Sequence, residues 1–87
     1  MNIIVVKRDG KEVSYDRNKI ICAINKALLE MDGNLKNDYI SENVVTSIES
    51  YFEAHSVECI TVEEIQDLVE RNLINGPRPD LAKYYIR

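Results

Sequence analysis

Three basic residues near the start of the chain have the types and the spacing best suited to binding an anion. Lys7 and Arg8 precede Asp9-Gly10, a dipeptide typical of tight hairpin turns, and Lys19 follows in the first turn of an expected helix. Helix N-termini favour anions because their first backbone N–H groups are unpaired. We therefore predict that the three cations converge on one phosphate chain. The alternative is that all three are ordinary solvated surface residues.

The sequence offers little for catalysis or for a structural metal. It contains one histidine, His55, at the end of an expected helix, and it has neither a glycine-rich phosphate loop nor a nucleophile motif. We expect His55 at the surface, where its cation complements the helix dipole. Cys22 and Cys59 lack the paired spacing of a zinc or redox site and are expected to be buried, reduced thiols. Neither catalytic residues nor a metal site are therefore expected.

Length, composition and charge limit the class of protein. With 87 residues, of which 45% are hydrophobic and 30% charged, the chain is expected to form one domain with a packed core. Its net charge of −4 argues against nucleic acid as a partner, because binding a phosphate backbone needs a basic face. No apolar run approaches the ~20 residues that span a bilayer, and no signal peptide is recognisable. We therefore expect no membrane contact and a cytoplasmic location.

The N-terminal part of the chain has the pattern of a β-hairpin. Residues 3–6 are β-branched and apolar, and residues 12–15 resume an extended alternation after a two-residue Asp9-Gly10 turn with positive φ angles. The unbroken apolar run predicts that the first strand is covered on both faces, and the alternation predicts that the second is covered on one. Residues 56–59 are expected to form a brief third strand or an extended linker.

Helical periodicity accounts for most of the remaining chain. Asp16 is placed to cap the first helix and Gly33 to end it, Thr61 and Glu64 have the spacing of a capping box, and Pro79 suits a first turn. The expected helices cover about residues 17–31, 38–54, 62–74 and 79–87. The predicted class is α+β, a small hairpin or three-stranded sheet covered by about four helices. Because the last helix ends without a cap, residues 1–87 are expected to be one domain of a longer chain.

Two stretches at opposite ends of the chain resemble the ATP-cone family. Residues 5–10 follow the pattern V-x-K-R-D-G, Tyr15-Asp16 comes next, and residues 19–27 follow K-I-x-x-A-I-x-x-A. Residues 60–70 are similar to the family's central helix, and residues 79–86 to its closing P-D-x-A-x-x-Y-I segment. The order and the spacing of these segments agree over the expected length.

The resemblance implies a regulatory domain rather than an enzyme. ATP cones bind a nucleotide between a hairpin and helices and regulate ribonucleotide reductases, the enzymes of deoxyribonucleotide synthesis for DNA replication. ATP permits activity and dATP stops it, with Mg²⁺ accompanying the nucleotide. The implied partners are the catalytic domain of a parent reductase and further copies through oligomerisation of the cone. The K-R-D-G-K-E-V stretch looks closest to the anaerobic ribonucleoside-triphosphate reductases, which implies such an enzyme as the parent.

The family pattern also implies the residues of a nucleotide site. Phosphates would be held by Lys7, Arg8 and Lys19, with Lys83 and Arg87 as helpers from the last helix. The base would be bordered by Val5, Ile20 and Thr61, the sugar would lie near Asp16, and Tyr84 is a further candidate. From the residues alone, Val5 and Ile20 suit the core equally well, Thr61 suits a helix cap, and at least one of Tyr84 and Tyr85 is expected in the core.

Two other functions remain open at this point. The same domain resembles the cone of a transcriptional repressor of reductase genes, in which a zinc ribbon precedes the cone. Here Met1 stands directly before the first strand and no four-cysteine ribbon is present, which favours the reductase. The second is a degenerate cone without nucleotide affinity, whose hairpin and tyrosine-rich last helix would dock on a protein partner.

Overall fold

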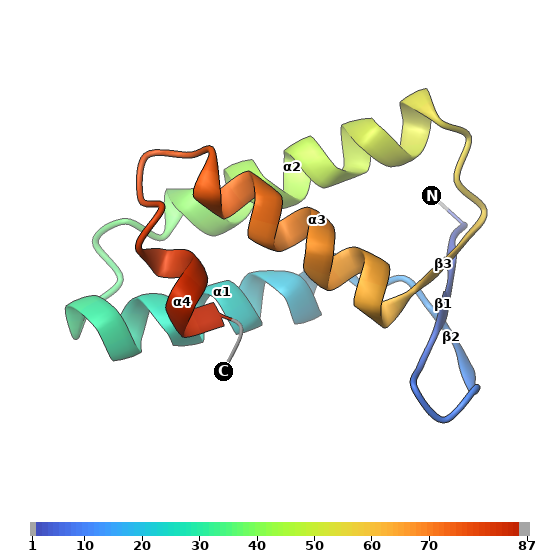
Figure 1. The fold of residues 1–87 in the computed structure, drawn as a ribbon, viewed down its shortest axis with the longest axis horizontal. Helices are drawn as coiled ribbons and strands as arrows, with labels where there is room; N and C mark the ends of the chain where they lie inside the picture. The colour runs from blue at the N-terminus through green and yellow to red at the C-terminus, as the bar shows by residue number, and fades with distance from the viewer. Residues whose placement is uncertain (1, 86–87) are drawn as a thin grey trace.

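The computed structural model describes residues 2–85, which form three long helices, a short fourth helix and a small sheet at one end (Figure 1). In chain order the elements are β1 (Ile4–Val6), β2 (Glu12–Ser14), α1 (Arg17–Asp32), α2 (Tyr39–Ala54), β3 (Cys59–Thr61), α3 (Val62–Ile74) and α4 (Leu81–Tyr85). The predicted α+β class is confirmed. The third strand begins at Cys59, later than the expected 56–59, and α4 begins two residues after Pro79.

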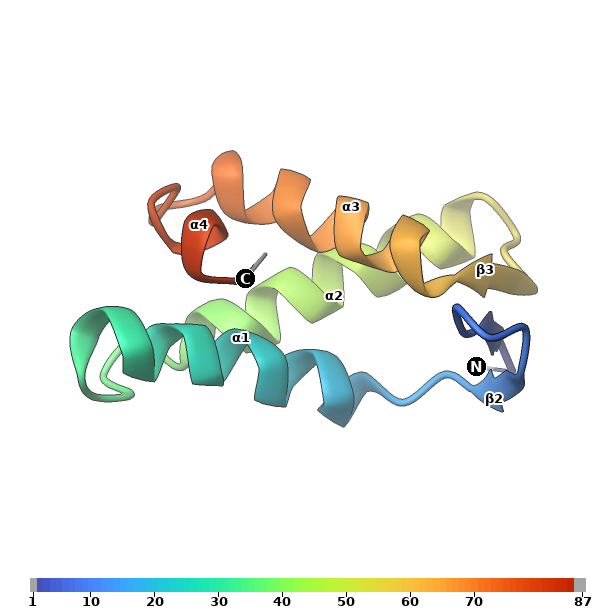
Figure 2. The same ribbon diagram turned by 60° about the horizontal axis from the view of Figure 1, so that its bottom comes forward.

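The long helices lie alongside one another, and α4 fits between two of them. α1 packs against α2 and α4, while α3 packs against α2 and α4. Figure 2 shows α4 between α1 and α3, so the last helix returns beside the first. None of the helices in residues 2–85 combines the length and the apolar character needed to cross a membrane.

The sheet has mixed topology with β1 in its centre. β2 pairs with β1 in antiparallel fashion and β3 pairs with β1 in parallel. Val5 lies opposite Val13 on one side and opposite Ile60 on the other, so these three residues share one face. A parallel pair needs a crossover, which α1 and α2 provide between β1 and β3.

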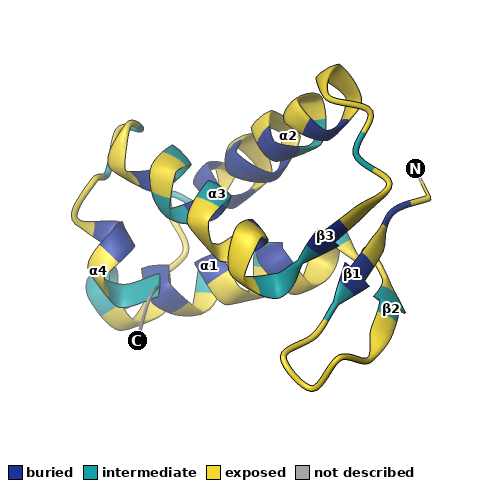
Figure 3. Cartoon of the chain, turned by 45° about the vertical axis from the view of Figure 1, so that its right-hand side comes forward, coloured by how far each residue is buried: buried dark blue, intermediate teal, exposed yellow. Residues whose placement is uncertain are grey.

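The sheet is covered on one face only. Val5 is buried, whereas its neighbour Ile4 is 38% exposed and Val6 is half-buried. Figure 3 shows this alternation along β1. The expectation that the first strand is covered on both faces is therefore wrong. Because the core lies on the side of Val5, successive side chains alternate between the core and solvent even though all are apolar.

The hairpin turn is longer than the expected two residues. The Gly10 N–H donates to the Lys7 carbonyl at 2.9 Å, and the Lys7 N–H donates to the Lys11 carbonyl at 2.8 Å. Gly10 has a φ of 87°, whereas Asp9 is not among the positive-φ residues. The loop between the paired residues Lys7 and Lys11 therefore has three residues, 8–10, and ends in a left-handed glycine. A three-residue loop of this kind needs only one positive φ, which corrects the two-residue prediction.

The predicted helix caps are confirmed. Asp16 Oδ1 accepts a 3.0 Å hydrogen bond from the Asn18 N–H, and Gly33 ends α1 in the left-handed conformation with a φ of 76°. Thr61 Oγ1 accepts from the Glu64 N–H, and Glu64 Oε1 accepts from the Thr61 N–H, each at 3.1 Å. These bonds satisfy N–H groups that the helices leave unpaired.

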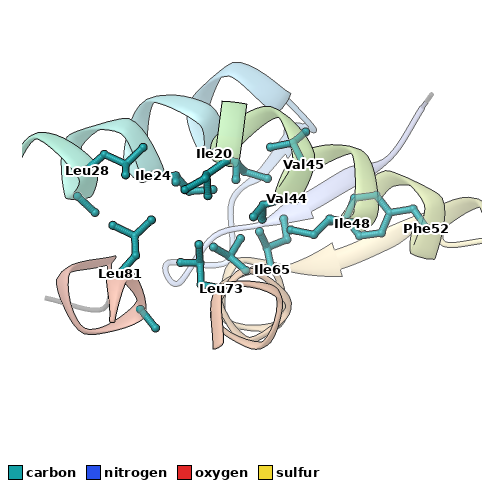
Figure 4. Packing of buried hydrophobic residues seen from close by; sticks show 14 of the residues in the cluster. Ile20, Ile24, Leu28, Val44, Val45, Ile48, Phe52, Ile65, Leu73 and Leu81 are labelled. Carbon is teal, nitrogen blue, oxygen red and sulfur yellow. The ribbon is translucent and has the colours of Figure 1, made fainter. Parts of the chain in front are cut away.

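The hydrophobic core runs along the inner faces of all four helices (Figure 4). Leu81 is fully buried and anchors the short α4, which is too brief to be stable alone. The largest buried side chains are Ile24, Leu28, Val45, Ile48, Phe52, Val69, Leu73 and Leu81. Tyr84 and Tyr85 both pack partly buried against this core.

The cysteines are placed differently from the prediction. Cys22 and Cys59 are both exposed and reduced. Cys22 follows the buried Ile20 by two residues, about 200° around the helix, and therefore faces solvent. Cys59 is paired with Ile4 and shares the open face of the sheet. His55 is exposed at the end of α2 as expected, and its ring stacks on that of Tyr51 with centroids 4.1 Å apart.

Candidate functional site

A cavity of about 230 Å³ lies between the hairpin and the N-terminal turns of α1 and α3. Tyr85 of α4 completes its wall. The apolar lining residues are Val5, Val13, Ile20, Ala23, Val62 and Ile65, and the polar ones are Lys7, Ser14, Tyr15, Asp16, Lys19, Gln66 and Tyr85. The cavity is thus mainly apolar with a few polar groups, the composition typical of small-molecule sites.

Two of the predicted cations line this cavity. Lys7 follows β1 at the start of the hairpin turn, and Lys19 lies in the first turn of α1. The tight turn and the Asp16 cap fix the backbone at both positions. Cations beside an apolar wall suit a ligand with one flat apolar part and one anionic part. Lys7 and Lys19 thus border the same cavity, whereas their convergence on a phosphate chain stays a prediction.

The third predicted cation, Arg8, lies on the rim. A neighbouring depression of about 310 Å³ is lined by Lys7, Arg8, Asp9 and Val62. It shares Lys7 and Val62 with the cavity, so the two hollows adjoin. Arg8 donates from Nε to Glu63 Oε2 at 3.1 Å. It also donates from Nη2 to Gln66 Oε1, 3.3 Å away.

Tyr15 forms a fixed part of the cavity wall. Its hydroxyl donates to Glu49 Oε2 at 2.8 Å, and its ring meets Phe52 edge to face with centroids 5.4 Å apart. Burial, followed by the hydrogen bond to Glu49, raises the pKa of Tyr15 well above its ordinary value. Tyr15 therefore stays a neutral hydrogen-bond donor in the physiological range.

Some predicted site residues lie elsewhere. The Thr61 hydroxyl is occupied by the capping box and does not line the cavity, although the next residue, Val62, does. Tyr84 packs against the core and Lys83 is exposed on α4, so Tyr85 is the described residue of α4 that lines the cavity. Arg87 lies outside the described residues.

Several lining residues were not predicted from the sequence. Ala23 lies one turn after Lys19 and Gln66 one turn after Val62, so helical spacing was a usable signal for both. Tyr85 had no such signal, because its position depends on how α4 packs against α1 and α3. The other residues that were missed are Val13, Ser14, Tyr15, Val62 and Ile65.

A hollow of about 250 Å³ between α2 and the α3–α4 connection is a weaker candidate. Its charged lining residue, Arg78, donates to both carboxylate oxygens of Asp32, at 2.8 and 3.0 Å. It also bonds Asp80 at 3.1 Å, and these contacts hold the pKa of both carboxyl groups below its usual value. The Arg78 charge is thus already neutralised within the fold, which leaves little attraction for an anion.

Comparison with known proteins decides the family. Residues 3–87 match the ATP cone domain. The chain belongs to the ATP-cone family. This cone is 40% identical over 89 residues to the vitamin B12-dependent ribonucleoside-diphosphate reductase of Thermoplasma acidophilum, covering 94% of the cone and 11% of that protein. It is 30% identical over 86 residues to the anaerobic ribonucleoside-triphosphate reductase of Haemophilus influenzae, covering 98% of the cone and 12% of that protein.

The family extends beyond the reductases. The cone is 32% identical over 73 residues to the transcriptional repressor NrdR of Synechococcus sp., covering 84% of the cone and 35% of the repressor. The chain spans about a tenth of the length of the reductases that it matches. Because those include a vitamin B12-dependent and an anaerobic enzyme, the similarity identifies a domain shared across reductases rather than one reductase class.

Proposed function

We propose that this ATP cone is an allosteric domain that binds ATP or dATP and switches a ribonucleotide reductase on with ATP and off with dATP. The observation that carries the proposal is the cavity whose apolar wall ends at Lys7 and Lys19. Its partners would be the catalytic domain of the parent enzyme and further copies of the cone. The resemblance of the K-R-D-G-K-E-V stretch to anaerobic reductases is what supports an anaerobic parent.

The cavity suits the base and sugar of a nucleotide, with the phosphates at the rim. Ligand pockets commonly measure about 300–1,000 Å³, so a cavity of about 230 Å³ is small for a whole triphosphate. Val5 and Ile20 would border the base, and Asp16 would lie near the sugar. Lys7 and Lys19 would hold the first phosphates. The chain of phosphates would then extend over the rim into the depression beside Arg8.

The remaining predicted residues would have peripheral roles. Lys83 and Arg87 would assist with the phosphates from the last helix and the residues after it. Thr61 would act by positioning Val62 through its cap, because its hydroxyl is already bonded to Glu64. Tyr84 would support Tyr85 from the adjacent position.

Magnesium would be bound mainly by the nucleotide. Within residues 2–85, no group of three His, Cys, Asp or Glu side chains could hold a metal ion. Asp16 is the carboxylate in the cavity lining. Mg²⁺ commonly binds through substrate phosphates and only one or two carboxylates. An accompanying Mg²⁺ would neutralise phosphate charge while Lys7 and Lys19 orient the phosphates.

Switching requires more than binding. ATP and dATP differ by the 2′-hydroxyl, and a ligand shifts an equilibrium only by binding one state better than the other. The Asp16 carboxylate would accept a hydrogen bond from this hydroxyl if the sugar lies where we propose. ATP and dATP would then differ in their position in the cavity. This difference would change the contact with Tyr85 of α4, because Tyr85 lines the same cavity.

Isothermal titration calorimetry of the chain with ATP, dATP and GTP in Mg²⁺ tests the binding part of this proposal. We expect saturable binding of both adenine nucleotides and little response to GTP. Lys7→Ala should weaken binding, whereas Lys36→Ala, in the α1–α2 connection, should not. The absence of binding by all three nucleotides in a folded sample would overturn the proposal and favour a protein-interaction module.

A repressor of reductase genes is the second candidate, supported by the match to the Synechococcus repressor over 84% of the cone. Nucleotide binding alone would not separate the two candidates. A mobility-shift assay of the full-length protein with the promoter of a reductase gene would do so. Specific DNA binding would favour the repressor, and reductase activity that responds to ATP and dATP would favour the first proposal.

A further inference from the structure

The rim of the cavity is bridged by an ion pair between the hairpin and α3. Arg8, in the hairpin turn, donates from Nε to Glu63 Oε2 at 3.1 Å, and Glu63 lies in the first turn of α3. The side chains are 72% and 51% exposed. A pair as exposed as this contributes little to stability. Its importance would lie in what it does to an incoming anion.

The contacts with Glu63 and Gln66 occupy one of the two edges through which the Arg8 guanidinium can offer paired N–H groups to a phosphate. A guanidinium binds a carboxylate or phosphate best through two N–H groups on the same edge. In this structure Nε is bonded to Glu63, and Nη2 is bonded to Gln66 at 3.3 Å. A phosphate must therefore displace both partners to bind this edge.

We propose that Glu63 lowers the affinity of the site for nucleoside triphosphates by competing for Arg8, and so sets the nucleotide concentration at which the site fills. This inference rests on the proposed nucleotide site. Lys7 and Lys19 line the cavity itself, whereas Arg8 borders only the adjoining depression. A monophosphate held by the two lysines leaves the Arg8–Glu63 pair intact. A triphosphate that extends to Arg8 and takes its Nε–Nη2 edge breaks the pair.

The movement of Arg8 from Glu63 to a phosphate would also change a residue that lines the cavity. Gln66 accepts a hydrogen bond from Arg8 and at the same time lines the cavity. When Arg8 moves to a phosphate, the Gln66 carboxamide is released to the base or sugar. Phosphate binding at the rim and recognition in the cavity are therefore linked through one side chain.

The first test compares ATP and AMP binding to the wild type and to Glu63→Gln by calorimetry at low salt. The substitution should strengthen ATP binding about two- to five-fold, the range expected for an exposed ion pair. It should leave AMP binding unchanged. Glu64→Gln is the matched control, because it removes the same charge one residue further along while glutamine can still complete the capping box. This control should bind ATP like the wild type.

The decisive measurement repeats the ATP titration of Glu63→Gln in a protein that also carries Arg8→Ala. In an Arg8→Ala background, Glu63→Gln should have no effect on ATP affinity, because nothing is left to compete for. An equal gain in both backgrounds would show simple repulsion by Glu63 and overturn the inference. An unchanged ATP affinity in Glu63→Gln would also overturn it while leaving the proposed function intact. Failure of the wild type to bind ATP or dATP would overturn both.

Discussion

The hydroxyl of Tyr15 donates a 2.8 Å hydrogen bond to Glu49 Oε2, which connects the cavity wall to the middle of α2. The same oxygen accepts from Arg17 Nε at 3.1 Å, and Arg17 also lies 3.6 Å from Glu42. Glu49 is only 21% exposed, so its charge depends on these two donors. A ligand that contacts Tyr15 would therefore act on α2 through this oxygen.

Tyr15→Phe removes one of the two donors to a partly buried carboxylate. We expect the free energy of unfolding to fall by about 1–2 kcal/mol, because hydrogen bonds to charged groups are the stronger ones. Urea denaturation at neutral pH measures the change. Tyr39→Phe is the matched control, because Tyr39 is 50% exposed at the start of α2. Equal denaturation midpoints for both variants would contradict this account of Tyr15.

The raised pKa of Tyr15 predicts how stability responds to alkali. A tyrosine in the unfolded chain ionises near its ordinary pKa of 10.0, whereas folded Tyr15 resists ionisation because of burial and the bond to Glu49. The neutral Tyr15 hydroxyl contributes its full share to the free energy of unfolding below pH 10, and this share is lost as the pH rises above that value. Tyr85, whose pKa is raised by burial, contributes in the same direction. Unfolding free energies measured on both sides of pH 10 should fall less steeply in Tyr15→Phe than in the wild type.

Lys19→Ala tests the proposed contact between Lys19 and a phosphate. A second lysine in the same helix, α1, provides the control. Losing a hydrogen bond to a charged group costs about 1.5–3 kcal/mol, so ATP affinity should fall about ten- to a hundred-fold. Lys26→Ala, further along α1 and outside the cavity lining, should change ATP affinity little. Calorimetric titration of both variants measures the difference. Similar losses in the two would indicate a general charge effect rather than a site.

The ion pairs of Arg78 with Asp32 and Asp80 lead us to expect a loss of stability in acid. Its contacts lower the pKa of Asp32 and of Asp80 below the ordinary 3.8, so the stability they contribute is present above that pH and lost as the pH falls through the lowered values. Arg78→Met should be less stable than the wild type at neutral pH, and the two curves should converge in strong acid. Denaturation across this pH range measures the effect. Arg71→Met, at the exposed end of α3, is the control and should run parallel to the wild type.

The features that were predictable from the sequence are those decided within a few residues. Asp16 caps α1 through its own second neighbour, and Gly33 ends that helix because it accepts a left-handed conformation. The capping box joins Thr61 and Glu64, which are three residues apart. Lys7 and Lys19 line one cavity, and their closeness was predictable because a tight turn and a helix start lie close together along the chain. Their contact with a phosphate stays a prediction.

The features that were missed depend on contacts between distant segments. Tyr85 rather than Tyr84 lines the cavity because of the way Leu81 anchors α4, and neighbouring tyrosines carry no signal for that choice. Ile4 is partly exposed because the helices cover one side of the sheet. Glu63 meets Arg8 only because β3 brings the start of α3 beside β1.

The parallel pairing of β1 with β3 has a consequence for the synthesis of the protein. Val5 pairs with Ile60, so during synthesis the second edge of β1 stays uncovered until β3 has been made. The cavity is completed later than the sheet, because its wall includes both Val5 and Tyr85. A nascent chain therefore cannot capture the ligand early. Binding would report that the domain has been made and folded to its last helix, and an abundant ligand would stabilise only that finished state.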